Sequence, residues 1–237
     1  MKLILSLLLL FVYASCTSSS NKDRRSAEET DGWHTLFDGK TLNGWHIYNK
    51  GNTASKWTAS HGVLLCDPKK KEGIFGDLVT DSIYENFELE LEWKVAKGGN
   101  SGIFINVQED PSYAATFATG LEMQLLDNTH AEHRHQIDST HWAGCLYAVD
   151  CVGGNSSPAA YGSWNRSRVV QQDGKVSFWL NGQLTFEGEI QSEKFRQKVS
   201  SGAMKAYPDF AKHSSGRIAL QNHTDSVSFR NIRIREL

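Results

Sequence analysis

Apolar and polar residues alternate along most of this chain with the two-residue period of β-strands. The clearest run is 87–93, where four apolar residues are separated by Glu88, Glu90 and Glu92. We expect these glutamates to meet water, because antiparallel sheets commonly expose one polar face. Further strands are predicted at 103–107, 121–125, 167–171, 176–180, 183–186, 217–222 and 227–235.

Turn signals separate the runs, whereas helical periodicity is almost absent. Asn181-Gly182 between two runs predicts a tight hairpin, and a register change is expected near Asn231. Residues 192–198 are the one short helix that we predict. The pattern is typical of an all-β sandwich of antiparallel sheets. Two connections, 127–143 and 149–164, are too long for hairpins, and loops of that length are often functional.

The first residues predict export. Met1 and Lys2 are followed by an apolar run, Leu3–Val12, which is too short to span a bilayer and suits a signal peptide. The small residues before Cys16 resemble a lipoprotein cleavage site, so we expect a signal peptide at 1–15 and a lipid on Cys16. Ordinary signal cleavage nearby is the alternative. A polar tether at 16–31 then leads into one domain at 32–237, held at the cell envelope, with the outer membrane favoured.

Charge and cysteine content bear on possible partners and on disulfide formation. The net charge of −2 with interspersed signs gives no basic surface for nucleic acid. Cys145 and Cys151 are close enough in sequence to bridge in an oxidising compartment, but the sequence leaves that pairing open. Cys66 is expected to be a small buried residue.

One strand combines candidate chemistry with a predicted core face. Leu121, Met123 and Leu125 should face the core, which turns Glu122 and Gln124 to the other side. A histidine-rich loop follows directly. Other polar faces would join this one if their strands were neighbours, and together they would offer the mixture of hydrogen-bonding groups and flat rings that sugars need. The residues concerned are Asn100, Trp179, Gln221 and His223.

The loop His130–Asp138 also raises the question of a metal. Imidazoles and carboxylates at short spacing can bind a divalent cation, yet the segment matches no zinc motif. A solvated or substrate-contacting loop is the favoured interpretation, and the cofactor stays open.

The order of several motifs resembles the 3-keto-disaccharide hydrolase domain family over residues 32–237. This resemblance implies a concanavalin A-like jelly roll, action on glycosides oxidised at C3, and a sugar oxidoreductase acting upstream. Two positions depart from the family pattern, Asn222 in place of Asp and Cys145 in place of Ala. The matching segments are 33–45, 100–104, 120–127, 143–147, 164–165, 179–182, 216–223 and 229–237.

The resemblance also implies a mechanism. A C3 ketone acidifies the hydrogen on C2, so proton abstraction, β-elimination of the C1 substituent and hydration give net hydrolysis. Glu122 or His223 would be the base, and His135 or Lys205, with or without a bound cation, would stabilise the enolate. The residues expected to orient the sugar are Asn100, Gln124, Asp127, Trp164 and Gln221.

Two other functions compete with this one. A conventional glycosidase would need a second carboxylate opposite Glu122, and Asp127 is the one nearby candidate. A carbohydrate-binding lipoprotein without catalytic activity would bind oxidised and unoxidised sugars alike.

Overall fold

The structure is a computed structural model that describes residues 31–237. The predicted signal peptide, the lipid on Cys16 and all but the end of the tether lie outside the described residues. Within residues 31–237, no helix is long and apolar enough to cross a membrane.

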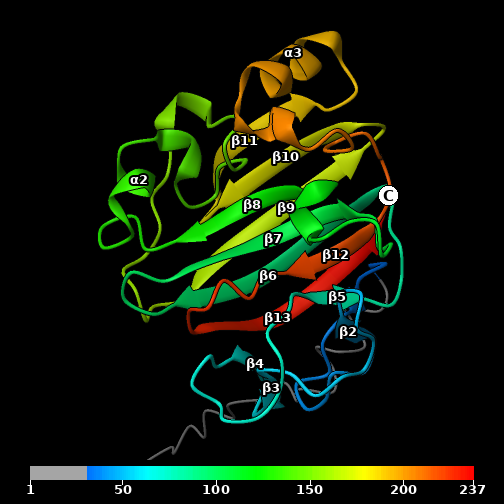
Figure 1. The fold of residues 1–237 in the computed structure, drawn as a ribbon, viewed down its shortest axis with the longest axis vertical. Helices are drawn as coiled ribbons and strands as arrows, with labels where there is room; N and C mark the ends of the chain where they lie inside the picture. Colours follow the sequence, from blue (N-terminus) through cyan, green and yellow to red (C-terminus); the bar gives the residue numbers. More distant parts are fainter. Residues whose placement is uncertain (1–30) are drawn as a thin grey trace, which may run out of the picture.

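Two antiparallel sheets form a jelly-roll sandwich, which confirms the predicted all-β fold (Figure 1). The first sheet runs in the order β11-β10-β9-β6-β13-β4-β3, with β1 also paired to β13. Its strands are β1 His34–Thr35, β3 Trp57–Ser60, β4 Val63–Cys66, β6 Phe87–Val95, β9 Asn165–Gln172, β10 Lys175–Leu180, β11 Gln183–Glu189 and β13 Val227–Glu236.

The second sheet runs in the order β2-β5-β12-β7-β8. Its strands are β2 Trp45–Ile47, β5 Leu78–Thr80, β7 Asn100–Val107, β8 Leu121–Leu126 and β12 Arg217–Leu220. Helices occupy the connections, with α3 at the top of the view beyond β11 and α2 at the left of β8 (Figure 1). They are α2 His133–Gln136 and α3 Glu193–Ser201, with short 3-10 helices η1 Thr116–Ala118, η2 Ser139–His141, η3 Val152–Gly154 and η4 Ala203–Ala206.

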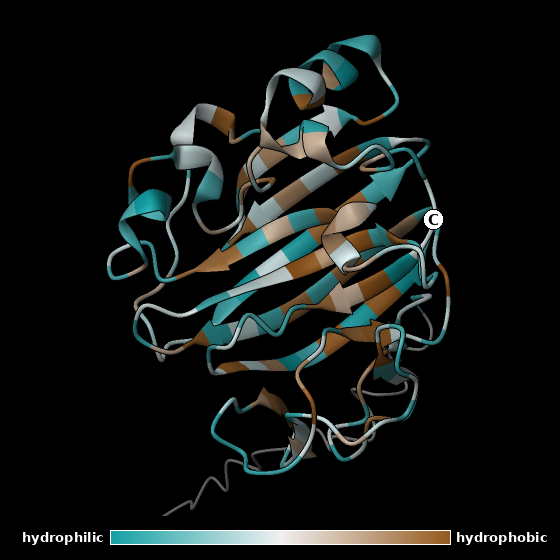
Figure 2. Cartoon of the chain, viewed as in Figure 1, coloured by the Kyte–Doolittle hydropathy of each residue, from teal (hydrophilic) through white to brown (hydrophobic). Residues whose placement is uncertain are grey.

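The core lies between the two sheets and follows the predicted alternation, which Figure 2 shows along the strands. From β8, Leu121, Met123 and Leu125 enter this core, as expected. Burial of such side chains contributes about 1.5–3 kcal/mol each, so the register that points them inward is strongly favoured. The same register turns Glu122 and Gln124 to the opposite face of the second sheet.

The predicted hairpin and helix are also confirmed. Asn181 and Gly182 both have positive φ, 51° and 86°, as a two-residue hairpin with a right-handed twist requires. The helix α3 begins after Ser192, whose hydroxyl accepts a hydrogen bond from the backbone N–H of Phe195 at 3.2 Å. It extends three residues beyond the predicted end at Lys198.

The alternation predicted for 103–107 is wrong at its end. Asn106 has a φ of 60°, and β7 contributes an extra residue opposite β12 at this point, which is a β-bulge. The bulge reverses the faces, so Val107 packs with Phe104 on the outer side while Asn106 is fully buried. Its side-chain Nδ2 donates to Gln171 Oε1 at 2.7 Å, and Gln171 Nε2 donates to Asn106 Oδ1 at 3.1 Å. A buried pair of amides therefore joins the two sheets.

The expectation that Glu88, Glu90 and Glu92 meet water is wrong for the first two, whereas the Glu92 side chain is 27% exposed. Glu88 and Glu90 are buried, at 5% and 8% exposure, beneath arginines of the flanking strands β9 and β13. Burial acts to raise the pKa of Glu90, but hydrogen bonds from Arg166 and Arg233 outweigh it and hold this pKa below the ordinary value. The ion pairs on this face are Glu88 with Arg168 and Arg235, Glu90 with Arg166 and Arg233, and Glu92 with Arg230.

Replacement of Gln171 by alanine tests the buried amide pair. The change leaves the Asn106 amide without its partner in the core, so we expect the free energy of unfolding to fall by about 3 kcal/mol. Chemical denaturation of the variant measures this loss. The neighbouring exposed residue gives the control, since Gln172→Ala should change stability by less than about 0.5 kcal/mol. Equal losses of unfolding free energy in the two variants would contradict the stabilising role assigned to the buried Asn106–Gln171 pair.

Candidate active site

A cavity of about 230 Å³ lies on the face of the second sheet that is turned away from the core. Strands β7 and β8 supply its floor, and the segment after β12 supplies one side. It brings together five residues that the sequence analysis singled out, namely Asn100, Glu122, Gln124, Gln221 and His223. Its remaining lining residues are Phe117, Arg134, Tyr147, Met204 and Tyr207.

Glu122 is the one carboxylic acid among the lining residues, and it is 6% exposed. No hydrogen bond from another described residue reaches its carboxyl group. Burial, with a smaller contribution from the negative charge of Asp77, raises the pKa of Glu122 well above the ordinary value for a glutamate. A carboxyl group in this setting keeps its proton to higher pH than an ordinary glutamate and is a stronger base once it loses it.

Space for this carboxyl group depends on a glycine in the neighbouring strand. Gly102 in β7 pairs with Gln124 in β8, beside Glu122. A Cβ atom at position 102 would lie 2.2 Å from Glu122 Oε1, which is closer than van der Waals contact allows. Glycine at this position therefore lets the side chain of Glu122 lie flat over β7.

Asp77 holds the side of the cavity in place, and sequence reasoning missed it. The residue directly precedes β5, and its carboxylate accepts hydrogen bonds from Thr116 Oγ1 at 2.5 Å and from the backbone N–H of Asn222 at 2.9 Å. Burial raises the pKa of Asp77 as well. Because Asn222 lies between Gln221 and His223, this contact fixes the segment that carries both of those side chains.

A chain of hydrogen bonds runs along the floor. Gln124 Nε2 donates to Asn100 Oδ1 at 2.8 Å, and Asn100 Nδ2 lies 3.5 Å from His135 Nε2. His135 is 2% exposed, and burial together with the nearby positive charge of Arg134 lowers its pKa to about 4. The imidazole is therefore neutral at pH 7, and its Nε2 accepts from Asn100. Its Nδ1 is buried without a hydrogen-bond partner among the described residues.

The outer edge of β8 carries a further wall of the cavity. The segment 144–147 runs along this edge, where the backbone N–H of Gly144 donates to the Gln124 carbonyl at 2.7 Å and that of Tyr147 donates to the Glu122 carbonyl at 3.0 Å. Burial and the negative charge of Glu122 raise the pKa of Tyr147, so its hydroxyl stays protonated as a hydrogen-bond donor. The sequence left the Cys145–Cys151 pairing open; the structure forms this disulfide, which closes a loop that contains Tyr147.

The remaining cysteine is where it was expected. Cys66 is fully buried and free, and burial raises the pKa of its thiol to about 12. It is therefore a packing residue.

Aromatic rings and a cation complete the cavity. The rings of Phe117 and Tyr207 meet edge to face with their centres 5.2 Å apart. Arg134 enters from α2, where its Nε donates to Glu132 Oε2 at 2.7 Å. The cavity thus offers one acid, one guanidinium, several amides and an aromatic edge, which are the groups that bind and polarise a sugar.

The structure places four predicted site residues outside the lining of this cavity: His135, which lies behind Asn100, and Asp127, Trp164 and Lys205. Asp127 accepts hydrogen bonds from Gly98 N and His130 Nδ1, both at 2.9 Å, and so shapes a turn. Trp164 lies on the first sheet, stacked on Arg230 at 4.1 Å. Lys205 lines a neighbouring hollow.

Six residues were expected to share one polar face; five of them line the cavity, and Trp179 does not. Trp179 belongs to β10 in the first sheet, where it stacks against Arg168 at 4.2 Å. The indole that we expected beside the sugar site is therefore on the other side of the sandwich. Phe117 and Tyr207 supply the rings instead.

Most of the residues that sequence reasoning missed come from irregular segments. Alternation cannot assign a face to side chains in η1, η4 or α2, which carry Phe117, Met204 and Arg134. A signal existed for Tyr147, which ends one of the segments that match the family pattern. Within residues 31–237 there is no group of three His, Cys, Asp or Glu side chains arranged to hold a metal ion.

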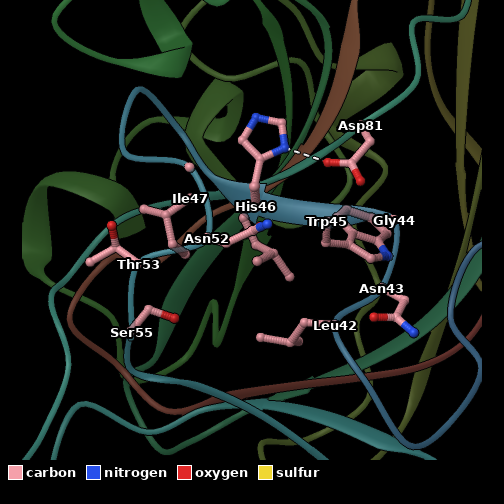
Figure 3. A pocket seen from close by; sticks show the side chains of 12 residues that line it. Leu42, Asn43, Gly44, Trp45, His46, Ile47, Asn52, Thr53, Ser55 and Asp81 are labelled. Atoms are coloured by element: carbon pink, nitrogen blue, oxygen red, sulfur yellow. Dashed lines mark hydrogen bonds and ion pairs between the residues drawn. The ribbon is translucent and has the colours of Figure 1, made fainter.

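A second polar hollow, of about 320 Å³, lies beside β2 at the opposite edge of the same sheet. Its histidine is already engaged, because His46 Nδ1 lies 2.6 Å from Asp81 (Figure 3) and its Nε2 lies 2.8 Å from Glu109. With a carboxylate on each ring nitrogen, this imidazole links the loops around β2 and has no free nitrogen for proton transfer. The cavity at Glu122 is therefore the candidate active site.

The raised pKa of Glu122 has a measurable effect on stability. Below about pH 4 the carboxyl group is protonated in both folded and unfolded chains. As pH rises, the unfolded chain loses this proton first, so the group destabilises the fold increasingly until the folded pKa is passed. We expect Glu122→Gln to match the wild type at pH 4 and to unfold at a higher temperature than the wild type at pH 8.

Thermal unfolding across this pH range measures the difference. The exposed residue Glu72 provides a matched control, since Glu72→Gln should leave the melting temperature within about 1 °C of the wild type at both pH values. A glutamine variant that is less stable than the wild type at pH 8 would show that Glu122 is held ionised by a partner.

Comparison with known proteins connects this chain to a family. Residues 32–235 match the model of the 3-keto-alpha-glucoside-1,2-lyase-like domain. A 3-keto-disaccharide hydrolase from Bacteroides thetaiotaomicron is 34% identical over an alignment that covers 88% of this chain and 80% of that protein.

Solved structures of glycosyl hydrolases also resemble this chain. A protein from Parabacteroides distasonis that is assigned as a glycosyl hydrolase is 33% identical, with a TM-score of 0.80 over 89% of this chain and 96% of that one. A second such protein from the same organism is 26% identical, with a TM-score of 0.66 over 86% and 99% of the two chains. The chain is an enzyme of the glycosyl hydrolase type and belongs to the family of the 3-keto-alpha-glucoside-1,2-lyase-like domain.

Proposed function

We propose that this enzyme cleaves 3-keto-glycosides, including 3-keto-disaccharides, by proton abstraction at C2, β-elimination of the C1 substituent and hydration of the product. The observation that supports this proposal best is the buried Glu122 carboxyl group, alone in a cavity lined by amides and a guanidinium. The names of the matching family and of the Bacteroides thetaiotaomicron relative support the substrate class.

Glu122 is the base in this proposal. Removal of a proton from carbon needs a base stronger than an ordinary carboxylate, and a carboxylate without water or donors has the required basicity. The C2 hydrogen of a bound sugar would face this group, while the neutral amides of Gln124 and Gln221 hold the hydroxyl groups. His223, which is more exposed, would give a proton to the departing oxygen.

The enolate needs positive charge or hydrogen-bond donors at the C3 oxygen. Arg134 and the Tyr147 hydroxyl both line the cavity and can supply them. Arg134 takes the place that the sequence analysis gave to Lys205, which lies elsewhere. His135 acts indirectly, because a neutral imidazole behind Asn100 orients the floor amides without contributing charge.

The arrangement does not suit a conventional glycosidase. Such an enzyme uses two carboxyl groups about 5–10 Å apart across the scissile bond. Among the described lining residues, Glu122 is the one acid, and the Asp127 carboxylate is engaged by a turn. A β-elimination route needs just one such base.

The proposed reaction needs a second enzyme that supplies the oxidised sugar. A sugar oxidoreductase must first convert the C3 hydroxyl group to a ketone, because the C2 hydrogen is not acidic otherwise.

We further propose that the protein is a lipoprotein of the cell envelope, anchored through Cys16. The apolar run Leu3–Val12 and the Cys145–Cys151 disulfide, which persists in oxidising compartments, support this location.

Removal of the base tests the mechanism directly. Glu122→Gln keeps the shape of the side chain, and we expect kcat on a 3-keto-disaccharide to fall at least about 100-fold. For the wild type, kcat/KM should rise with pH until the raised pKa of Glu122 is passed. Glu72→Gln should retain full activity. An active Glu122→Gln variant would remove Glu122 from the mechanism.

A substrate comparison separates the proposed function from its alternatives. The enzyme should cleave a 3-keto-disaccharide and leave the parent disaccharide intact, because the parent has no acidic C2 hydrogen. Product formation by chromatography measures both. Equal cleavage would indicate a conventional glycosidase, and binding of both without cleavage would indicate a binding protein. A parallel series with a chelator reports whether a divalent cation takes part.

A further inference from the structure

A second hollow adjoins the active-site cavity and shares a residue with it. It has a volume of about 490 Å³ and lies between α3 and the segment 205–212. Tyr207 lines both hollows, and Met204 and Lys205, neighbours in η4, line one each. We call this second hollow the α3 slot.

The size of the active-site cavity leaves part of a glycoside outside it. At about 230 Å³ the cavity is smaller than the roughly 300–1,000 Å³ that is usual for ligand sites. It suits a single sugar ring, so the group attached at C1 must leave past the rim. Tyr207 forms part of that rim, and the α3 slot begins on its other side.

The floor of the α3 slot is apolar. Ile190, Phe195 and Phe210 are buried there at 1–5% exposure, and half-buried Val199 stands one helical turn after Phe195. In the neighbouring cavity, several amides are available to orient sugar hydroxyl groups. Gln191 is the one amide among the residues that line the α3 slot. Such a surface favours a flat apolar group over a second sugar.

The rim of the slot is cationic. Arg196 is paired with Glu193 at 3.0 Å, and Lys212 is paired with Asp209 at 3.2 Å. Lys205 is exposed, and no acidic partner reaches it from the part of the chain that the structure describes. The slot therefore presents one uncompensated positive charge above an apolar floor.

We propose that the α3 slot binds the leaving group of the substrate, and that its preferred occupant is an aromatic aglycone that ends in a carboxylate. This inference rests on the proposed function, since it assigns the part of the same substrate that extends beyond the sugar. The aromatic ring would pass Tyr207 and lie on Phe195 and Val199, and Lys205 would pair with the carboxylate.

Binding of free 4-hydroxycinnamate tests the slot without any catalysis. Calorimetric titration should show binding to the wild-type protein and at least about tenfold weaker binding to Lys205→Gln and to Val199→Asp. Lys194→Gln removes the same charge from the exposed side of α3 and should bind like the wild type. The methyl ester of the acid should be insensitive to Lys205→Gln.

Kinetics then test the role in the reaction. The 3-keto-glucoside of 4-hydroxycinnamate should lose about tenfold in kcat/KM in Lys205→Gln, through KM, whereas Lys194→Gln should keep the wild-type value. If the acid does not bind, or if Lys194→Gln loses as much affinity or kcat/KM as Lys205→Gln, the role proposed for the α3 slot is wrong. The proposed function is not affected by that result. Binding of the acid with no cleavage of any 3-keto-glycoside would overturn the proposed function and the aglycone role with it.

Discussion

The chemistry of this protein depends on one carboxyl group that is buried and that no described residue pairs with through a hydrogen bond or an ion pair. Two features of the second sheet produce this condition. Alternation in β8 turns Glu122 away from the core, and the missing side chain at Gly102 lets its carboxyl group lie against the neighbouring strand. The first sheet shows the opposite arrangement, because there the buried Glu88 and Glu90 each pair with two arginines, and those on Glu90 hold its pKa below the ordinary value. The same residue type thus has a structural role on one face of the sandwich and a chemical role on the other.

The surroundings of Glu122 are fixed by contacts that lie outside the cavity. Asp77 fixes the segment that carries Gln221 and His223, and neutral His135 supports the amides of the floor. The backbone pairing of 144–147 with β8 places Tyr147 next to the acid. A catalytic group of unusual pKa is useful only when its neighbours cannot move to neutralise it, and these contacts restrict such movement.

The fold was predictable because its strands obey a local rule. Alternation located the strands that supply the floor, and it assigned Glu122 and Gln124 to the correct face. The rule failed at Asn106, where a bulge exchanges the faces, and at Glu88 and Glu90, where the arginines come from strands far away in sequence. For the site, alternation could find residues in strands but could not place Arg134, Phe117 or Tyr207, since irregular segments have no period. Lys205 and Trp164 show a second limit of sequence reasoning. Their side chains suit sugar binding or catalysis, but residue type alone does not show that the fold places them outside the cavity.

The bulge in β7 has a consequence for how this sequence can vary. The extra residue at Asn106 sets which side of the sheet every later position of the strand occupies, and the Asn106–Gln171 pair then links the two layers. Individual side chains upstream of it can be exchanged as long as their size is kept. Loss or gain of one residue between Gly102 and Asn106 would shift that register by a full step. Natural variants of this enzyme should accordingly differ by replacement within the strand, with length changes confined to the connecting loops.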